Sequence, residues 1–234
     1  MIQTYNWRTH IGYTPVLQYP VEDHMENLIK SKERVSKYGE VYTPSWMIND
    51  MVQLVQMEVD RIDSRFLEPA CGSGNFLVDI LSRKISLVEE RYGRDTFEKA
   101  HFLLLALMSI YGVELLEDNA QECRKNLSSL IIDSFGGERI ANWKLAVERI
   151  TELNIVQGDA LTMTTQEGTP LTFPEWSYLG KGLFQRRDFQ FQVLTLRAGI
   201  KGTLFEELKD SEIFKPTQIF KKQSITEIAK NGTN

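Results

Sequence analysis

The chain has 234 residues and a formal net charge of −5 at pH 7, with 42% hydrophobic and 25% charged residues. This composition predicts a packed globular core, and the length suits one α/β domain with an appendage. The acidic balance argues against non-specific coating of nucleic acid, which needs many Lys/Arg–phosphate pairs. A local basic groove, or a partner that supplies most of the grip on nucleic acid, stays compatible with it.

No segment of the sequence indicates a membrane or an oxidising compartment. The longest apolar run, 102–107, is too short to span a bilayer, and the first residues have no signal-peptide core. Two cysteines, Cys71 and Cys123, are too few for a disulfide framework or a zinc cluster. We therefore expect a cytoplasmic protein without a metal site and without a membrane partner.

The N-terminal part is expected to be an arm, residues 1–36, followed by a capped helix. Thr43 suits an N-cap and Pro44 suits the first helical position. Apolar residues from Met47 to Val55 then recur at helical spacing. Taken alone, segment 37–44 is an ordinary helix start.

A glycine-rich turn at 68–76 joins a short apolar run to a helix. Gly72 and Gly74 permit close backbone approach to a ligand, and the helix that follows points free N–H groups at the turn. A dinucleotide-binding turn needs a third glycine, but Leu77 stands there. Glu68 would also repel a pyrophosphate. The turn therefore favours a cationic or zwitterionic ligand over a nicotinamide dinucleotide.

The chain beyond the turn alternates helices with short strands. Helices are expected at 75–91, 96–108, 118–131 and 140–150, and strands at 110–114 and 153–157. Glu114 ends the first of these strands, where a carboxylate can accept hydrogen bonds from both hydroxyls of a ribose. A surface acid at a strand end is the alternative. Asp159 and Ala160 follow the second strand.

Three motifs together resemble a known family. The stretch Glu-Pro-Ala-Cys-Gly-Ser-Gly-Asn-Phe at 68–76 resembles the cofactor motif of S-adenosylmethionine-dependent DNA methyltransferases, particularly the N6-adenine class. Gly39 with Tyr-Thr-Pro at 42–44 is similar to the family segment before that motif, and Gly-Asp-Ala-Leu at 158–161 is similar to the next one. The resemblance covers residues 37–161 and includes the helical insertion of restriction-system methylase subunits.

The resemblance implies a Rossmann-like, mostly parallel sheet with helices on both faces and the cofactor at the carboxyl ends of the strands. It implies a domain at 37–200 and a C-terminal helix and tail at 201–234. Glu114 would bind the ribose and Asp159 the adenine amino group. The implied cofactor contacts are Tyr42, Thr43, Pro44, Glu68, Pro69, Ala70, Gly72, Gly74, Asn75, Phe76, Glu114, Asp159 and Ala160.

The family's catalytic motif, Asn/Asp/Ser-Pro-Pro-aromatic, is missing. In the family its oxygens accept the N–H groups of the target adenine, and its aromatic residue stacks on the flipped base. No Pro-Pro pair occurs in the chain, and Phe173-Pro174-Glu175-Trp176 is the nearest segment. The catalytic residues therefore stay unassigned.

Aromatic and basic residues alternate at 176–189, and a strand is expected at 189–194. The basic segment is either a nucleic-acid contact or an ordinary hairpin or docking surface. For the whole chain the resemblance implies a site-specific adenine DNA methyltransferase from a restriction-modification or phage-related setting, with DNA bound directly or through a partner subunit. The alternative is a catalytically deficient S-adenosylmethionine-binding protein that acts as a regulatory or partner subunit.

Overall fold

The computed structural model describes residues 29–136, 140–200 and 215–230. The chain divides into two compact units, Met1–Pro44 and Ser45–Asn234, and each is described by itself. In the first unit, α1 (Lys32–Tyr38) begins at Ser31, whose hydroxyl accepts a hydrogen bond from the Arg34 N–H. The helix ends at Gly39, which has a φ of +68°. Of the expected arm at 1–36, residues 1–28 lie outside the described residues.

The second unit is built on a three-stranded parallel sheet with the order β1-β2-β3. Its strands are β1 (Phe66–Glu68), β2 (Ile110–Glu114) and β3 (Ile155–Gln157). All five residues of the central strand β2 are buried. The order in space follows the order in the chain, and helices form the crossovers, as parallel strands require.

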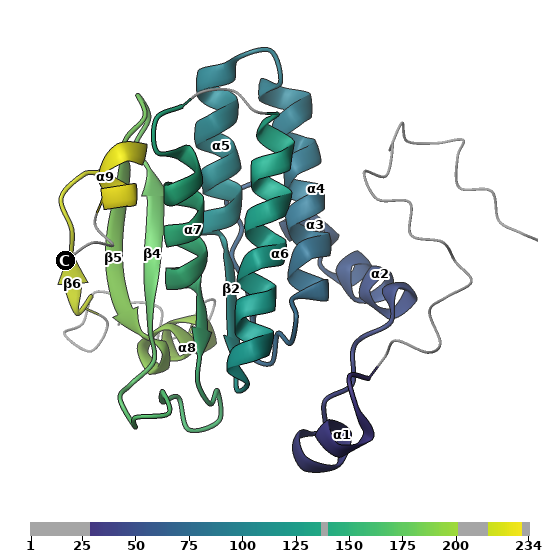
Figure 1. The fold of residues 1–234 in the computed structure, drawn as a ribbon. Coiled ribbons are helices and arrows are strands. Elements are labelled where there is room, and N and C mark those ends of the chain that lie inside the picture. Colours follow the sequence, from purple (N-terminus) through teal and green to yellow (C-terminus); the bar gives the residue numbers. More distant parts are fainter. Residues whose placement is uncertain (1–28, 137–139, 201–214, 231–234) are drawn as a thin grey trace, which may run out of the picture. The chain divides into compact units, whose positions relative to one another are not determined.

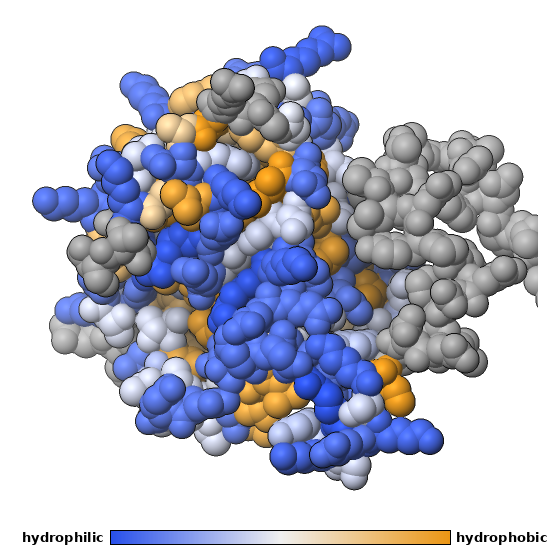
Figure 2. Space-filling model, in the orientation of Figure 1, coloured by the Kyte–Doolittle hydropathy of each residue, from blue (hydrophilic) through white to orange (hydrophobic). Residues whose placement is uncertain are grey.

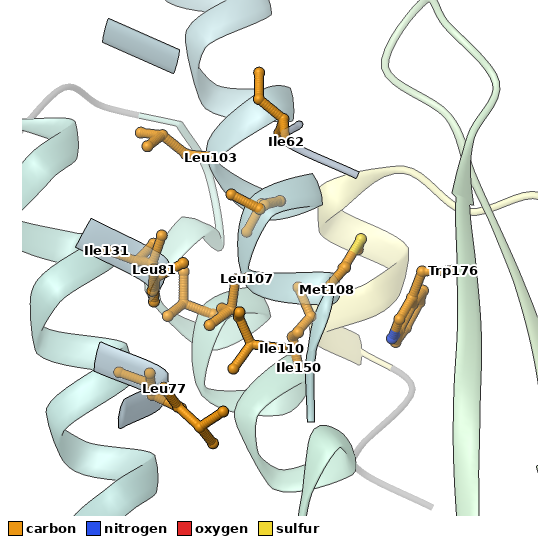
Figure 3. Close-up of a cluster of buried hydrophobic side chains, with 14 of the residues drawn as sticks. Ile62, Leu77, Leu81, Leu103, Leu107, Met108, Ile110, Ile131, Ile150 and Trp176 are labelled. Carbon is orange, nitrogen blue, oxygen red and sulfur yellow. The ribbon is translucent and has the colours of Figure 1, made fainter. Parts of the chain in front are cut away.

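One face of this sheet is covered by helices. In Figure 1, α4, α5, α6 and α7 lie side by side over β2. Leu77 and Leu81 from α4, Ile131 from α6 and Ile150 from α7 belong to the same buried cluster (Figure 3). The helices of the second unit up to this point are α2 (Ser45–Leu54), α3 (Gln56–Val59), α4 (Asn75–Tyr92), α5 (Thr96–Met108), α6 (Glu117–Phe135) and α7 (Trp143–Asn154).

The other face of β2 packs against a different layer. Side chains alternate along a strand, so Tyr111 and Val113 point away from the helices. They form a second buried cluster with Leu171, Phe173 and Phe191. These come from or adjoin an antiparallel sheet of order β4-β5-β6 and the helix after it. The elements are β4 (Thr172–Tyr178), β5 (Phe184–Gln190), α8 (Phe191–Ile200), β6 (Gln218–Ile219) and α9 (Ile225–Lys230).

The mixed α/β class with a parallel sheet is confirmed, and so are the helices and strands expected between 75 and 157. The strand expected at 189–194 is wrong. The Phe/Gln alternation holds only to Gln190, and Phe191 begins α8 while its N–H donates to the Leu171 carbonyl. The helix α9 packs against the main core, where Ile225 and Ile228 are buried.

The surface drawn in Figure 2 is mostly hydrophilic, with separate apolar patches between the polar side chains. Trp46, Leu54 and Met57 on α2 and α3 are among the exposed apolar residues. Within the described ranges, no helix combines the length and hydropathy needed to cross a membrane.

Candidate functional site

The carboxyl ends of the three parallel strands bring the predicted acids to one edge. Glu68 ends β1 opposite Gly112, and Glu114 ends β2 opposite Gln157 of β3. Asp159 follows β3 by two residues, and the Gly158 N–H between them donates to the Glu114 carbonyl. This is the edge at which open α/β sheets bind their ligands.

The Glu114 carboxylate is held by three donors. Its Oε2 accepts from the Gly72 N–H at 2.8 Å, which ties the glycine turn to the end of β2. Its Oε1 accepts from the Leu116 N–H at 3.0 Å and from Asn119 Nδ2 at 3.4 Å. A carboxylate offers about four acceptor sites. The side chain is thus fixed in place, with acceptor capacity left for a ligand hydroxyl.

The Glu68 carboxyl group, unlike that of Glu114, is poorly supplied with hydrogen-bond donors. Its Oε2 is buried and has no hydrogen-bond partner among the residues that the structure describes. Burial, and secondly the charge of Glu114, raise the pKa of Glu68 to about 8. A carboxyl group in this state gains from any cation or donor that enters beside it.

The two glycines of the turn have left-handed backbones, with φ of +53° at Gly72 and +89° at Gly74. Gly74 is also the N-cap residue of α4. A Cβ on Gly74 would lie 2.5 Å from the sulfur of Cys123 on α6, and one on Gly112 would lie 2.8 Å from the sulfur of Cys71. Packing inside the protein therefore already requires glycine at positions 74 and 112, apart from any ligand.

The thiol of Cys71 lies in the interior beside that of Cys123. A hydrogen bond with Cys123 raises the pKa of Cys71 above its ordinary value, and burial is the second largest cause. Both cysteines are free and buried. Buried protonated thiols are unreactive, so we assign this pair to packing of the turn.

The other predicted contacts are distributed over three places. Pro69, Ala70 and Asn75 are exposed on the turn, and Phe76 packs against the main core. Tyr42, Thr43 and Pro44 belong to the first unit, and the Tyr42 hydroxyl donates to Glu40. Their role toward a cofactor stays a prediction.

Asp159 is engaged in its own turn. Its Oδ1 accepts from the Leu161 N–H at 2.8 Å and more weakly from the Thr162 N–H at 3.4 Å. This is a side chain that stabilises a local turn. Ala160 packs against the second cluster. The carboxyl group of Asp159 therefore has a structural role at the edge, whatever else it binds.

Sequence reasoning missed two asparagines that support the turn. Asn119 reaches Glu114, and Asn126 Nδ2 donates to the Ser73 carbonyl at 3.0 Å. Both come from α6, which follows the strand that Glu114 ends. A buried polar position on the apolar face of this helix was the available signal, and Asn119 is only 1% exposed.

The segment nearest to a catalytic motif lies inside β4. The Pro174 carbonyl accepts from the Tyr111 hydroxyl at 2.8 Å, and Glu175 forms ion pairs with Arg65 and Arg187. Trp176 is buried, and its Nε1 donates to Asn154 at 3.1 Å. These groups stabilise the hairpin and are not presented by an open loop.

The basic and aromatic segment 176–189 forms the β4–β5 hairpin. Arg186 is buried and bonds Asp188 through two contacts of 2.7 Å. Its guanidinium also lies 4.2 Å from the ring centroid of Phe220. Because Arg186 is neutralised and covered, it cannot serve as a free phosphate contact.

Comparison with known proteins finds a family model that matches part of the chain. Residues 21–134 match the family model described as N-6 DNA Methylase. Over this stretch the chain is N6-adenine DNA methyltransferase-like. The matched methylase segment contains Glu68, the glycine turn and Glu114, and it ends before Asp159 and β4. No curated protein matches the chain, and no solved structure does.

Across residues 29–136, 140–200 and 215–230, no group of three or more His, Cys, Asp or Glu side chains is placed to hold a metal ion. The candidate site of this N-6 DNA methylase-like chain consists of the two glutamates and the glycine turn.

Proposed function

We propose that the chain binds S-adenosylmethionine at the carboxyl edge of β1–β3 and serves N6-adenine methylation of DNA. The observation that carries this proposal is the pair of glutamates at the turn. One carboxylate is fixed by the Gly72 N–H, and the other has a buried oxygen without a hydrogen-bond partner among the described residues. The match to the DNA methylase family model supports the DNA substrate.

The residues at this edge fit the chemistry of that cofactor. When bound, the cofactor supplies a methyl group on a positively charged sulfur, together with an amino acid ammonium group. The Glu68 carboxylate would compensate this positive charge. Without the cofactor, its Oε2 has no hydrogen-bond partner among the described residues. Glu114 would accept from the ribose hydroxyls while Gly72 and Leu116 keep its carboxylate oriented.

The remaining contacts of the proposal follow the motifs. Asp159 would accept from the adenine amino group, with Ala160 beside it. Tyr42, Thr43 and Pro44 would contact the methionine part. Residues 69–76, with Pro69, Ala70, Gly74, Asn75 and Phe76, would line the turn side of the cofactor.

Calorimetric titration with S-adenosylmethionine and its demethylated product tests the binding. We expect Glu114→Ala to weaken binding at least tenfold. The matched control is Glu117→Ala, because the Glu117 side chain is 43% exposed at the start of α6. Absence of binding by the unchanged protein, or equal affinity for both variants, would overturn the cofactor site.

Methyl transfer is tested separately. Tritiated cofactor is incubated with DNA and the protein, and the label in DNA is counted. Label in N6-methyladenine establishes the enzyme, and binding without label favours the second candidate. That candidate is a catalytically deficient cofactor-binding protein that acts as a partner subunit in a restriction-modification or phage-related system.

One observation favours this second candidate. The Pro174 segment is committed to hydrogen bonds and ion pairs within the hairpin, and the sequence has no Pro-Pro pair. If the second candidate is right, the cofactor raises the thermal stability of the protein without being consumed. Addition of a methylase partner that carries the catalytic motif would then restore label in DNA.

A further inference from the structure

A cavity lies at the end of the parallel sheet opposite the proposed cofactor site. It has a volume of about 490 Å³ and is lined by the segment before β1, the end of α4, α5 and β4. Arg65 lines it immediately before β1, and Glu68 ends that strand at the glycine turn. Three strand residues separate the two ends, roughly 10 Å of extended chain. The cavity is thus distinct from the proposed cofactor site.

Positive charge gathers around this cavity. Arg61, Arg65 and Arg91 line it against the single acid Asp63, which leaves a formal surplus of two positive charges among the lining side chains. The chain as a whole carries −5. A cationic cavity in an acidic protein indicates an anionic ligand.

Two of these arginines are weakly engaged by the protein. Arg61 lies 3.5 Å from Asp63 and 3.6 Å from Glu58 in exposed pairs, which contribute little. Arg91 donates to the Asp60 carbonyl at 3.4 Å, a long contact. Arg65 differs, because it bonds the buried carboxylate of Glu175 at 2.7 Å. Arg61 and Arg91 are therefore the two that a ligand can recruit.

Aromatic side chains line the same cavity. Tyr92 stacks on Phe102 with ring centroids 4.0 Å apart and planes 4° apart, and Tyr178 meets Phe102 edge-on at 5.4 Å. Trp176 from β4 also lines it. Figure 3 shows this side chain as part of the buried cluster. Trp176 is buried, but Tyr92, Phe102 and Tyr178 are partly exposed and fixed by one another, so these three rings present rigid surfaces to a flat ligand.

We propose that this cavity binds a nucleoside monophosphate, either free or at the end of a nucleic acid strand. Arginine suits phosphate because its planar fork donates two parallel hydrogen bonds. Aromatic rings suit a nucleobase because each base offers a flat π-face. The volume falls within the range of small-molecule sites. The inference is independent of the proposed cofactor site, because the two share no residue.

Titration calorimetry with AMP and dAMP tests the proposal in the full chain, with saturating S-adenosylmethionine present in one arm. We expect binding of AMP or dAMP in both arms. The double variant Arg61→Ala/Arg91→Ala should weaken it at least tenfold, whereas Arg149→Ala, which removes a partly exposed arginine paired with Glu152 on α7, should leave it unchanged. Thermal melting of each variant verifies that the fold is retained.

Further ligands separate the sources of the phosphate and the role of the rings. A 5′-phosphorylated oligonucleotide that binds more tightly than AMP indicates a strand end, and the reverse indicates a free nucleotide. Inorganic phosphate that binds as tightly as AMP would overturn the nucleoside assignment. AMP binding that is equally tight in the double arginine variant would also overturn the proposal. The absence of AMP and dAMP binding at millimolar concentration would do the same.

Discussion

Gly74 lies against Cys123, so closely that a single added carbon on the glycine would come within 2.5 Å of the cysteine sulfur. The contact joins the N-terminus of α4 to the middle of α6, the helices that follow β1 and β2. The turn between β1 and α4 is therefore positioned from inside the protein. A ligand at this edge meets a turn that packing has already shaped.

Gly74→Ala should lower the free energy of unfolding by about 2–4 kcal/mol, because it combines left-handed strain with overpacking. Gly168→Ala is the matched control, since Gly168 has a φ of +78° and open space around it. The control should lose about 1–2 kcal/mol. Urea unfolding measures both. Equal losses would show that packing against Cys123 contributes nothing.

The free energy of unfolding should respond to pH through Glu68. Its pKa is about 8 in the folded protein and 4.5 without the fold, so between these values the folded state holds a proton that the unfolded state lacks. The contribution of Glu68 is therefore present below pH 4.5 and is lost as the pH rises to 8. In urea unfolding, the free energy of unfolding of Glu68→Gln should rise relative to that of the unchanged protein from pH 5 to pH 8. The exposed Glu90→Gln variant should show no such relative rise.

Binding of a cation beside Glu68 should release a proton. Because a positive charge favours the carboxylate, uptake of S-adenosylmethionine at pH 7 should expel up to about one proton per molecule. Calorimetry in buffers with different ionisation enthalpies measures this number. Glu68→Gln should abolish the release. A release that survives this substitution would assign the proton to another group.

Asn154 should contribute strongly to the stability of the second unit against unfolding. Its Nδ2 faces three carbonyls, the nearest being that of Ile110 at 2.9 Å, and its Oδ1 accepts from Trp176. Asn154→Leu would leave these buried groups unpaired and should cost about 2–4 kcal/mol in unfolding free energy. Trp176→Phe removes one hydrogen bond and should cost less. If melting ranks the two variants in reverse, packing of the indole outweighs the hydrogen bonds.

Lys84 should stabilise the segment before β1. It is buried in α4, and its ammonium donates to the carbonyls of Arg61, Ile62 and Ser64 at 3.1, 2.9 and 2.6 Å. Lys84→Met should cost about 2–4 kcal/mol, because three carbonyls lose their donor. Lys144→Met on the exposed side of α7 serves as the control and should change stability by less than about 0.5 kcal/mol. Chemical denaturation measures the unfolding free energy of both variants, and equal losses would contradict the prediction.

The sequence by itself determined the local features of this protein. Helical spacing gave α4 to α7, short apolar runs gave the parallel strands, and the glycine turn with Glu68 and Glu114 gave the candidate site. These features depend on residues near one another in the chain. Periodicity and turn chemistry record them directly.

Only the tertiary structure decided which side chains are already committed. Segment 176–189 alternates aromatic and basic residues, and only the fold shows that Arg186 within it is buried against Asp188. The Gly74–Cys123 contact, and the Glu68 oxygen that has no hydrogen-bond partner among the described residues, could not be predicted from the sequence. Each depends on groups from elements far apart in the chain, so desolvation and contact arise only when the fold brings them together.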